Sequence, residues 1–330
     1  MFRRRFTAVR RLTYCCMLVL SGTLTSNGEA VAAAYPAKPV RLIVPFPPGG
    51  GTDILARLIG QRLGERLNVQ FVVDNRPGAG TNIGMELAAR AVPDGYTIIM
   101  ASIGLSANPS LYPRMTFDPA RDLTPVTLVA IAPTILAGHP SVVAKTPQEL
   151  VALAKAQPGH LNYGSFGAGS GAHLAAELFK LVTGVDIVHV PYKGGGPAII
   201  ALLAGEVQLV FSSMLPVLPH VKSGRLRAIG LAAARRSPAA PEVPTFRESG
   251  IPYETGTWFG ILAPTGTPTE VVRRLHREIV DILSSNEVRD RIAREGAGPV
   301  GNTPDEFARF IKDESVRWAK VVKTAKIKVD

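Results

Sequence analysis

The chain has 330 residues, of which 46% are hydrophobic and 6% aromatic, and its formal net charge is +11. That length allows one large domain or two ordinary ones, and the hydrophobic content excludes a disordered chain. Two cysteines exclude a disulfide-dense scaffold and any four-cysteine metal or iron–sulfur site.

The first 34 residues have the order of a secretory signal peptide. Five arginines precede an apolar stretch at 12–24, and small residues follow up to three alanines at 32–34. The stretch is too short to span a membrane. We therefore predict a signal peptide over 1–34. Export follows the Sec route or, because RRRF at 3–6 fits part of the twin-arginine pattern, that pathway.

Removal of residues 1–34 changes the net charge and the cysteine content of the chain. The remainder carries a net charge of about +7, and both Cys15 and Cys16 are lost. The mature chain then has no thiol and no disulfide. No later segment reaches spanning length, because the apolar run at 126–138 is broken by Pro133. We expect a soluble periplasmic protein that is not embedded in the membrane.

Strands and helices alternate in the same order in both halves of the chain. Buried strands are predicted at 40–46, 69–74 and 97–100 in the first half, and at 161–165, 186–190 and 207–211 in the second. Glycine-rich loops and helices separate these strands, including a helix that begins at Thr52 or Asp53 and another over 172–182. This alternation predicts an α/β protein with two lobes, each a mostly parallel sheet flanked by helices.

The C-terminal part supplies further strands and a group of helices. Strands are predicted at 226–231 and 258–262, and helices at 269–284, 287–295 and 304–323. We expect the apolar runs at 126–137 and 255–263 to cross between lobes. The predicted first lobe is therefore discontinuous, 35–134 plus 256–330, and the second lobe is 135–255.

Four glycine-rich loops precede predicted helices, at 46–53, 75–81, 164–171 and 191–197. Free N–H groups and the helix dipole make such a helix start favourable for an anion, and glycine allows close approach. Hydroxyl donors that could assist are Thr52, Ser102, Ser165 and Ser170. The alternative is that each loop is only a tight turn.

Several other side chains near these loops are candidates with a structural alternative. Asp53 either complements the helix dipole or faces a ligand, and His173 either contacts a ligand or is structural. Lys193 could pair with an anion, and so could Arg76. Aromatic side chains that could wall a pocket are Phe46, Tyr192 and Trp258.

The sequence gives little support for a catalytic site, a metal site or a nucleic-acid interface. GAGSGA at 167–172 resembles a dinucleotide fingerprint, but Asp186 begins the second strand instead of ending it. There is no P-loop and no nucleophile elbow, and the six histidines are scattered, so we expect no cofactor and no metal. The basic residues alternate with acids on the C-terminal helices, which disfavours nucleic acid.

Several motifs in fixed order resemble the exported receptors of tripartite tricarboxylate transporters, the Bug family. They are VPFPPGGGTD at 44–53, NRPGAG at 75–80, PDGYT at 93–97, NYGS at 162–165, GS at 169–170, HL at 173–174, and VPYKG at 190–194. NP at 108–109 and PTF at 244–246 also fit, so the resemblance runs from about Tyr35 to the C-terminus.

The resemblance implies a two-lobed periplasmic binding fold that closes on a small carboxylate in a cleft between the lobes. It implies ligand contacts from Phe46, Pro48, Gly50, Thr52 and Asp53 in one lobe, and from Ser165, Gly169, Ser170 and His173 in the other. The chain departs from the family pattern at Gly104-Leu105, Ile200-Ala201 and Ser212-Ser213. These departures suggest a less polar cleft floor.

We therefore expect a monomeric receptor that performs no chemistry and delivers a small organic carboxylate to the membrane subunits of such a transporter. The predicted contacts also include Ser102, Tyr192 and Lys193. Two alternatives remain: a receptor that feeds a sensor kinase, and an exported α/β enzyme that acts on a carboxylate.

Overall fold

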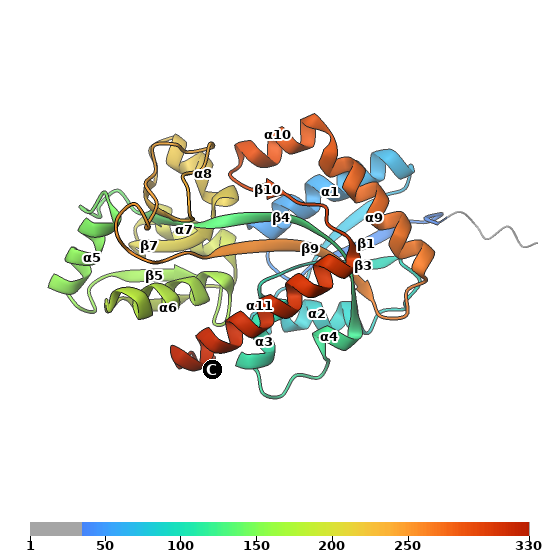
Figure 1. The fold of residues 1–330 in the computed structure, drawn as a ribbon, viewed down its shortest axis with the longest axis horizontal. Helices are drawn as coiled ribbons and strands as arrows, with labels where there is room; N and C mark the ends of the chain where they lie inside the picture. Colours follow the sequence, from blue (N-terminus) through green and yellow to red (C-terminus); the bar gives the residue numbers. More distant parts are fainter. Residues whose placement is uncertain (1–34, 330) are drawn as a thin grey trace, which may run out of the picture. The chain divides into compact units, whose positions relative to one another are not determined.

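The computed structural model describes residues 35–329, so the predicted signal peptide lies outside the described residues. The strands form one ten-stranded mixed sheet with a main order of β2-β1-β3-β9-β4-β7-β5-β6, and β10 and β8 also pair with β4 (Figure 1). Parallel pairs stand at both ends of this order, β1 with β2 and β3, and β5 with β6 and β7. The expected doubled α/β pattern is present.

The elements near both ends of the described chain make up the part of the sheet from β2 to β9 and its helices, which is called the first lobe below. They are β1 (Val40–Val44), α1 (Gly51–Leu67), β2 (Phe71–Asn75), η1 (Ala79–Thr81), α2 (Asn82–Ala89), β3 (Thr97–Ser102), α3 (Gly104–Leu111), α4 (Pro119–Asp122), β9 (Gly256–Pro264), α9 (Thr269–Ser284), α10 (Asn286–Arg294), β10 (Gly298–Pro299) and α11 (Pro304–Thr324). A capping box at Thr303 and Glu306 begins α11, because each residue's side chain accepts a hydrogen bond from the other's backbone N–H.

The middle of the chain forms β5 to β8 and the helices before and between them, which are called the second lobe below. Its elements are α5 (Pro147–Ala156), β5 (Asn162–Ser165), α6 (Gly171–Thr183), β6 (Val188–Pro191), α7 (Gly195–Ala204), β7 (Leu209–Ser213), α8 (Met214–Lys222) and β8 (Arg227–Ala232).

The long strand β4 (Leu123–Gly138) belongs to both lobes. Up to Pro133 it pairs with β9, and from Thr134 onward it pairs with β7 and β8. The chain returns beside the same point, since the Thr134 N–H donates to the Thr255 carbonyl at 3.1 Å. The two connections between lobes are therefore adjacent (Figure 1).

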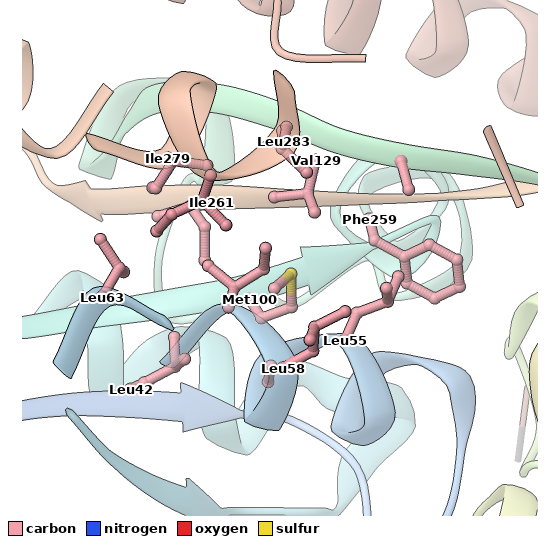
Figure 2. Close-up of a cluster of buried hydrophobic side chains, with 14 of the residues drawn as sticks. Leu42, Leu55, Leu58, Leu63, Met100, Val129, Phe259, Ile261, Ile279 and Leu283 are labelled. Carbon is pink, nitrogen blue, oxygen red and sulfur yellow. The ribbon is translucent and has the colours of Figure 1, made fainter. Parts of the chain in front are cut away.

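The central strands of each lobe are buried on both faces, and neighbouring side chains along a strand point to opposite faces. Leu42 and Val44 join a core under α1 and α9 that Figure 2 shows with Met100 and Ile279, whereas Ile43 joins a second core on the other face. The same alternation recurs along the second half of β4, where neighbouring side chains enter the two cores of the second lobe. Within residues 35–329, no helix is both long and apolar enough to cross a membrane.

Candidate ligand-binding site

Five helices begin around one small cavity, each directly after a strand. They are α1 after β1, α3 after β3, α6 after β5, α7 after β6, and α8 after β7. This inner cavity has a volume of about 40 Å³. It is lined by Phe46, Gly50, Gly51, Thr52, Ser102, Ile103, Thr134, Phe166, Gly171, Ala172, Gly195, Phe211, Ser212, Ser213, Thr257 and Phe259. Both lobes contribute, and the carboxyl ends of parallel strands are where α/β proteins bind ligands.

The start of α1 leaves backbone N–H groups free beside the inner cavity. Gly50 caps the helix in an extended conformation without a side-chain hydrogen bond, and the first intrahelical bond reaches it from Ile54. A Cβ at Gly51 would lie 2.8 Å from the Ser213 Oγ and 3.1 Å from the Phe259 ring. The backbone of α1 therefore approaches β7 and β9 as closely as only glycine allows.

The Asp53 side chain stabilises the conformation of the loop at 46–50. Its buried carboxylate accepts hydrogen bonds from the Gly49 N–H at 3.0 Å, from Arg57 at 2.9 Å and from the Asn75 amide at 2.9 Å. Burial raises the pKa of Asp53, but these hydrogen bonds outweigh it and the net pKa is lowered. Asn75 also donates to the Phe46 carbonyl at 2.9 Å. A charged Asp53 thus fixes the shape of residues 46–50.

A histidine pair supports the corresponding loop of the second lobe. The His173 and His189 rings stack with centroids 4.1 Å apart. The His173 Nδ1 accepts from the Gly169 N–H at 3.0 Å, and the His189 Nε2 lies 2.6 Å from the Ser165 Oγ. Ser170 caps α6 by accepting from the His173 N–H. These contacts hold residues 165–170 beside the cavity.

Both imidazoles have lowered pKa values. Burial lowers the pKa of His189 to about 4, and the neighbouring His173 adds to that shift. Burial also lowers the pKa of His173, although the Glu177 carboxylate opposes the change. Both rings are therefore neutral near pH 7, which suits the acceptor role of the His173 Nδ1.

Hydroxyl groups supply the remaining polar atoms of the inner cavity, from Thr52, Ser102, Thr134, Ser212, Ser213 and Thr257. The Ser212 Oγ is buried and has no hydrogen-bond partner among residues 35–329. Within that range, the lining contains no ionisable side chain. An anion here would be held by N–H groups, helix dipoles and hydroxyls, without a counter-charge.

A larger outer cavity of about 370 Å³ adjoins the inner one, because Phe46 and Phe166 line both. Its other lining residues are Pro45, Pro47, Pro77, Gly78, Ala79, Gly80, Thr81, Gly167, Ser170, Tyr192, Lys193 and Gly194. Lys193 is the single cationic side chain in the described lining of either cavity. It lies two residues before Gly195, where α7 begins beside the inner cavity.

The predicted site residues fall into three groups. Four line the inner cavity: Phe46, Gly50, Thr52 and Ser102. Ser170, Tyr192 and Lys193 line the outer cavity, together with Phe46. Five line neither: Pro48, Asp53, Ser165, Gly169 and His173. Direct ligand contact by any of these residues stays a prediction.

Two of the other candidates have structural partners. The Trp258 ring packs edge-on against Phe307 and Phe310, with centroids 5.7 and 5.9 Å away. Arg76 pairs with Asp74 at 2.9 Å. Neither side chain lines the two cavities.

Sequence reasoning missed several lining residues, chiefly Thr134, Phe166, Phe211, Thr257 and Phe259, and it noted Ser212 only as a departure from the family pattern. Ser212 carried a usable signal, since it is one of the two serines that end β7, as Ser102 ends β3. Thr134 and Thr257 carried none, because they lie within the two crossing strands.

A comparison with protein families matches residues 55–327 to the tripartite tricarboxylate transporter family receptor. The chain is 41% identical to protein BugT of Bordetella pertussis over 295 residues, which cover 88% of this chain and 90% of BugT. These matches cover nearly all of the part of the chain that the structure describes.

Solved structures agree with the sequence matches. The R. palustris protein Rpa4515 with adipate superposes with a TM-score of 0.87 at 40% identity, covering 90% of this chain and 100% of that one. MatC (Rpa3494) from Rhodopseudomonas palustris with bound malate has a TM-score of 0.82 at 32% identity, covering 87% and 100%. The predicted two-lobed receptor fold is confirmed.

Proposed function

Because the chain belongs to the tripartite tricarboxylate transporter receptor family, we propose that it captures a small organic carboxylate and delivers it to the membrane subunits of such a transporter. The predicted family is thereby confirmed. Its relatives are solute-binding receptors, and this chain is a receptor and not an enzyme. Delivery to membrane subunits is the part of the proposal that rests on family membership alone.

The observation that carries the proposal is the convergence of five helix starts on one uncharged cavity. Each start offers free N–H groups and about half a positive charge. A hydrogen bond to a charged group is worth about 1.5–3 kcal/mol, so a few aligned donors hold a carboxylate without arginine or lysine. Carboxylates in two similar receptors, adipate and malate, support this ligand class.

We infer lobes of 35–134 plus 256–330 and of 135–255. The change of partner along β4 falls within one residue of the first boundary, since Pro133 pairs with Gly256 of β9 and Thr134 pairs with strands of the second lobe. Closure of these lobes would bring the two sides of the inner cavity onto the ligand. The chain works as a monomer in this proposal, without a metal or cofactor.

We also propose that residues 1–34 direct export to the periplasm by the Sec or twin-arginine route and are then removed. The basic, apolar and small-residue order of that segment supports this. N-terminal sequencing of the secreted protein should begin near Tyr35. A mature protein that retains the arginines at positions 3–5 would contradict it.

The test is to identify the ligand and to follow its fate. Mass spectrometry of the protein purified under native conditions should show a bound carboxylate. A thermal-shift screen of di- and tricarboxylates, amino acids and aromatic acids should show stabilisation that rises with ligand concentration. The ligand should be recovered intact after long incubation, and deletion of the gene should abolish its uptake by cells.

Three outcomes would contradict the proposal in different ways. If none of the carboxylates raises the melting temperature, the ligand class is wrong. If the ligand is converted to a product, the chain is an exported enzyme. If uptake persists without the gene while a sensor response is lost, the receptor serves signalling.

A further inference from the structure

Three helices of the second lobe, α6, α7 and α8, begin at the inner cavity, but they contact the first lobe in different ways. Two of them bring a leucine to the first lobe within their first four residues, Leu174 in α6 and Leu215 in α8. Both leucine side chains are buried. The start of α7 has a different contact, which is made by glycines.

Leu174 packs into an apolar cluster whose other buried members belong to the first lobe. They come from α3, α11 and the chain after α11, and they are Ile103, Ala107, Leu111, Trp318, Val322 and Ile327. The loop before α6 lies close to the same elements, because a Cβ at Gly169 would lie 3.1 Å from the Leu111 side chain and 3.3 Å from that of Val329. Separation of α6 from α3 and α11 would expose this apolar surface to water, which is unfavourable.

Leu215 makes a similar contact on the opposite face of the sheet. It belongs to the core under α1 and α9, whose other buried members come from the first lobe and the first half of β4. The start of α8 lies close to that lobe, since a Cβ at Gly296 would lie 2.6 Å from the Met214 Cβ. Leu174 is on the other face, because α3 and α11 also supply the core that Ile43 joins.

Helix α7 keeps its buried side chains within its own lobe. Ile199 and Leu202 belong to a cluster formed by residues of the second lobe. The start of α7 meets the first lobe where a Cβ at Gly195 would lie 3.4 Å from the Gly50 Cα. Such a contact buries little apolar surface, so less free energy is needed to separate it than to separate either leucine contact.

We propose that Leu174 and Leu215 are positioning residues that define the axis about which the two lobes rotate. The axis passes through both leucine contacts and crosses the sheet where β4 and β9 connect the lobes. The lobes then separate at the loops 47–50 and 194–196. A ligand reaches the inner cavity through the outer cavity, whose lining includes Pro47 and Gly194. The inference goes beyond the proposed function, since it concerns the direction of motion and holds for a ligand of any class.

Spin labels can measure this motion, because the chain after residue 34 contains no cysteine to compete with introduced ones. Gln61→Cys in α1 and Ile200→Cys in α7 are a pair of exposed positions in helices that begin at the two glycine loops. Double electron–electron resonance of the ligand-free protein should give this pair a broad distribution of distances. Addition of adipate should make the distribution shorter and narrower.

Two further pairs of exposed positions report on the leucine contacts. Leu181→Cys in α6 with Lys320→Cys in α11 reports on the Leu174 contact, and Lys222→Cys in α8 with Arg294→Cys in α10 reports on the Leu215 contact. Both pairs should give narrow distributions that are the same with and without adipate.

Leu174→Ala should broaden the distribution between α6 and α11, because the smaller side chain leaves the apolar cluster incompletely packed. Leu150→Ala in α5 is the matched control, since Leu150 is a fully buried leucine whose cluster lies within the second lobe. Both variants should lower the melting temperature. Broadening in Leu174→Ala alone would therefore separate a positioning role from a general loss of stability.

Three results would overturn the inference. They are a narrow distribution between α1 and α7 in the ligand-free protein, a broad distribution for either leucine pair in the unaltered protein, and no broadening in Leu174→Ala. Failure of the proposed function is a separate result, in which no carboxylate binds. The distributions of the ligand-free protein decide the inference in that case as well.

Discussion

Ser212 is a buried hydroxyl at the end of β7 whose Oγ has no hydrogen-bond partner within residues 35–329. A buried polar group without a hydrogen-bond partner is unfavourable. The presence of the Ser212 hydroxyl beside the inner cavity therefore fits a role in binding the ligand. The position was noted from sequence only as a departure from the family pattern. Its environment depends on α1 and β9, which lie far away in the chain.

Ser212→Ala should weaken carboxylate binding about tenfold and leave the melting temperature of the ligand-free protein unchanged or slightly raised. The reason is the loss of one hydrogen bond to a charged group, worth about 1.5–3 kcal/mol. Isothermal calorimetry measures the affinity. Ser106→Ala is the control, since Ser106 is equally buried in α3 but lines neither cavity. Equal affinities of all three proteins would remove Ser212 from the site.

The stacked pair of His173 and His189 makes stability depend on pH. Both pKa values are lowered in the folded protein, that of His189 to about 4, against about 6.5 in the unfolded chain. Between pH 6.5 and 4 the unfolded state binds more protons, so the free energy of unfolding falls as the pH falls. Above pH 6.5 this contribution is complete.

His189→Gln should therefore flatten the decline of the unfolding free energy between pH 6.5 and 4. The slope should decrease by up to about 1.4 kcal/mol per pH unit, the value for one proton. Urea denaturation at a series of pH values measures it. His160→Gln, at an exposed histidine, is the matched substitution outside the stacked pair. A steeper decline in His189→Gln would contradict the neutral pair.

At the scale of elements, the glycine loops of the two lobes meet through backbone atoms and the Pro47 ring. A Cβ at Gly194 would lie 2.4 Å from Pro47, and one at Gly196 would lie 2.8 Å from the Pro48 carbonyl oxygen. Only residues without side chains permit this approach. The loops 47–50 and 194–196 therefore meet because both are glycine-rich.

The methyl group added by Gly196→Ala should prevent the two lobes from closing fully. The position is helical and has no positive φ, so alanine suits α7 itself and should not lower its stability. Carboxylate affinity should fall at least tenfold, and small-angle scattering should show less compaction with ligand than for the unaltered protein.

Gly60→Ala in α1 is the control, because a Cβ there meets ordinary contacts of 3.6 Å or more. The Gly60→Ala variant should bind the carboxylate and become more compact with ligand, as the unaltered protein does. Normal compaction of Gly196→Ala on ligand addition would show that the two loops do not govern closure.

Most strands and the C-terminal helices were predictable, because their apolar spacing and caps are local signals. Strand β4 and helix α9 follow the predicted runs, and the capping box of α11 is present. Helices α3 and α8 were missed, since Pro109 and Pro219 stand inside them. Proline normally ends a helix, and here surrounding packing overrides that preference.

At the scale of the whole molecule, one sheet continues through both lobes along β4. The two lobes were predictable from the doubled pattern of strand, glycine loop and helix. The cavity between them was not, because its lining joins residues as distant as Thr52 and Thr257. Such contacts are set by tertiary packing and leave no periodic signal in either segment.

The shared sheet predicts that both lobes unfold together. Both tryptophans, Trp258 and Trp318, lie in elements of the first lobe, so fluorescence follows that lobe whereas far-ultraviolet circular dichroism follows both. The two melting curves should coincide. Phe179→Ala in the core of the second lobe removes a fully buried ring and should cost about 3–5 kcal/mol.

That variant should lower the fluorescence midpoint as much as the dichroism midpoint, by several degrees. Val316→Ala, at an exposed position of α11, should move neither. A fluorescence curve that stays in place while the dichroism curve shifts would mean that the lobes unfold independently.

The contact between the glycine loops also affects whether the receptor closes without ligand. Backbone meeting backbone at Gly50 and Gly195 buries little apolar surface, so the contact itself contributes little free energy to closure. The bound anion must then supply most of the preference for the closed state. Closure would report occupancy, and a membrane partner that recognises the closed face would not be engaged by unloaded receptors.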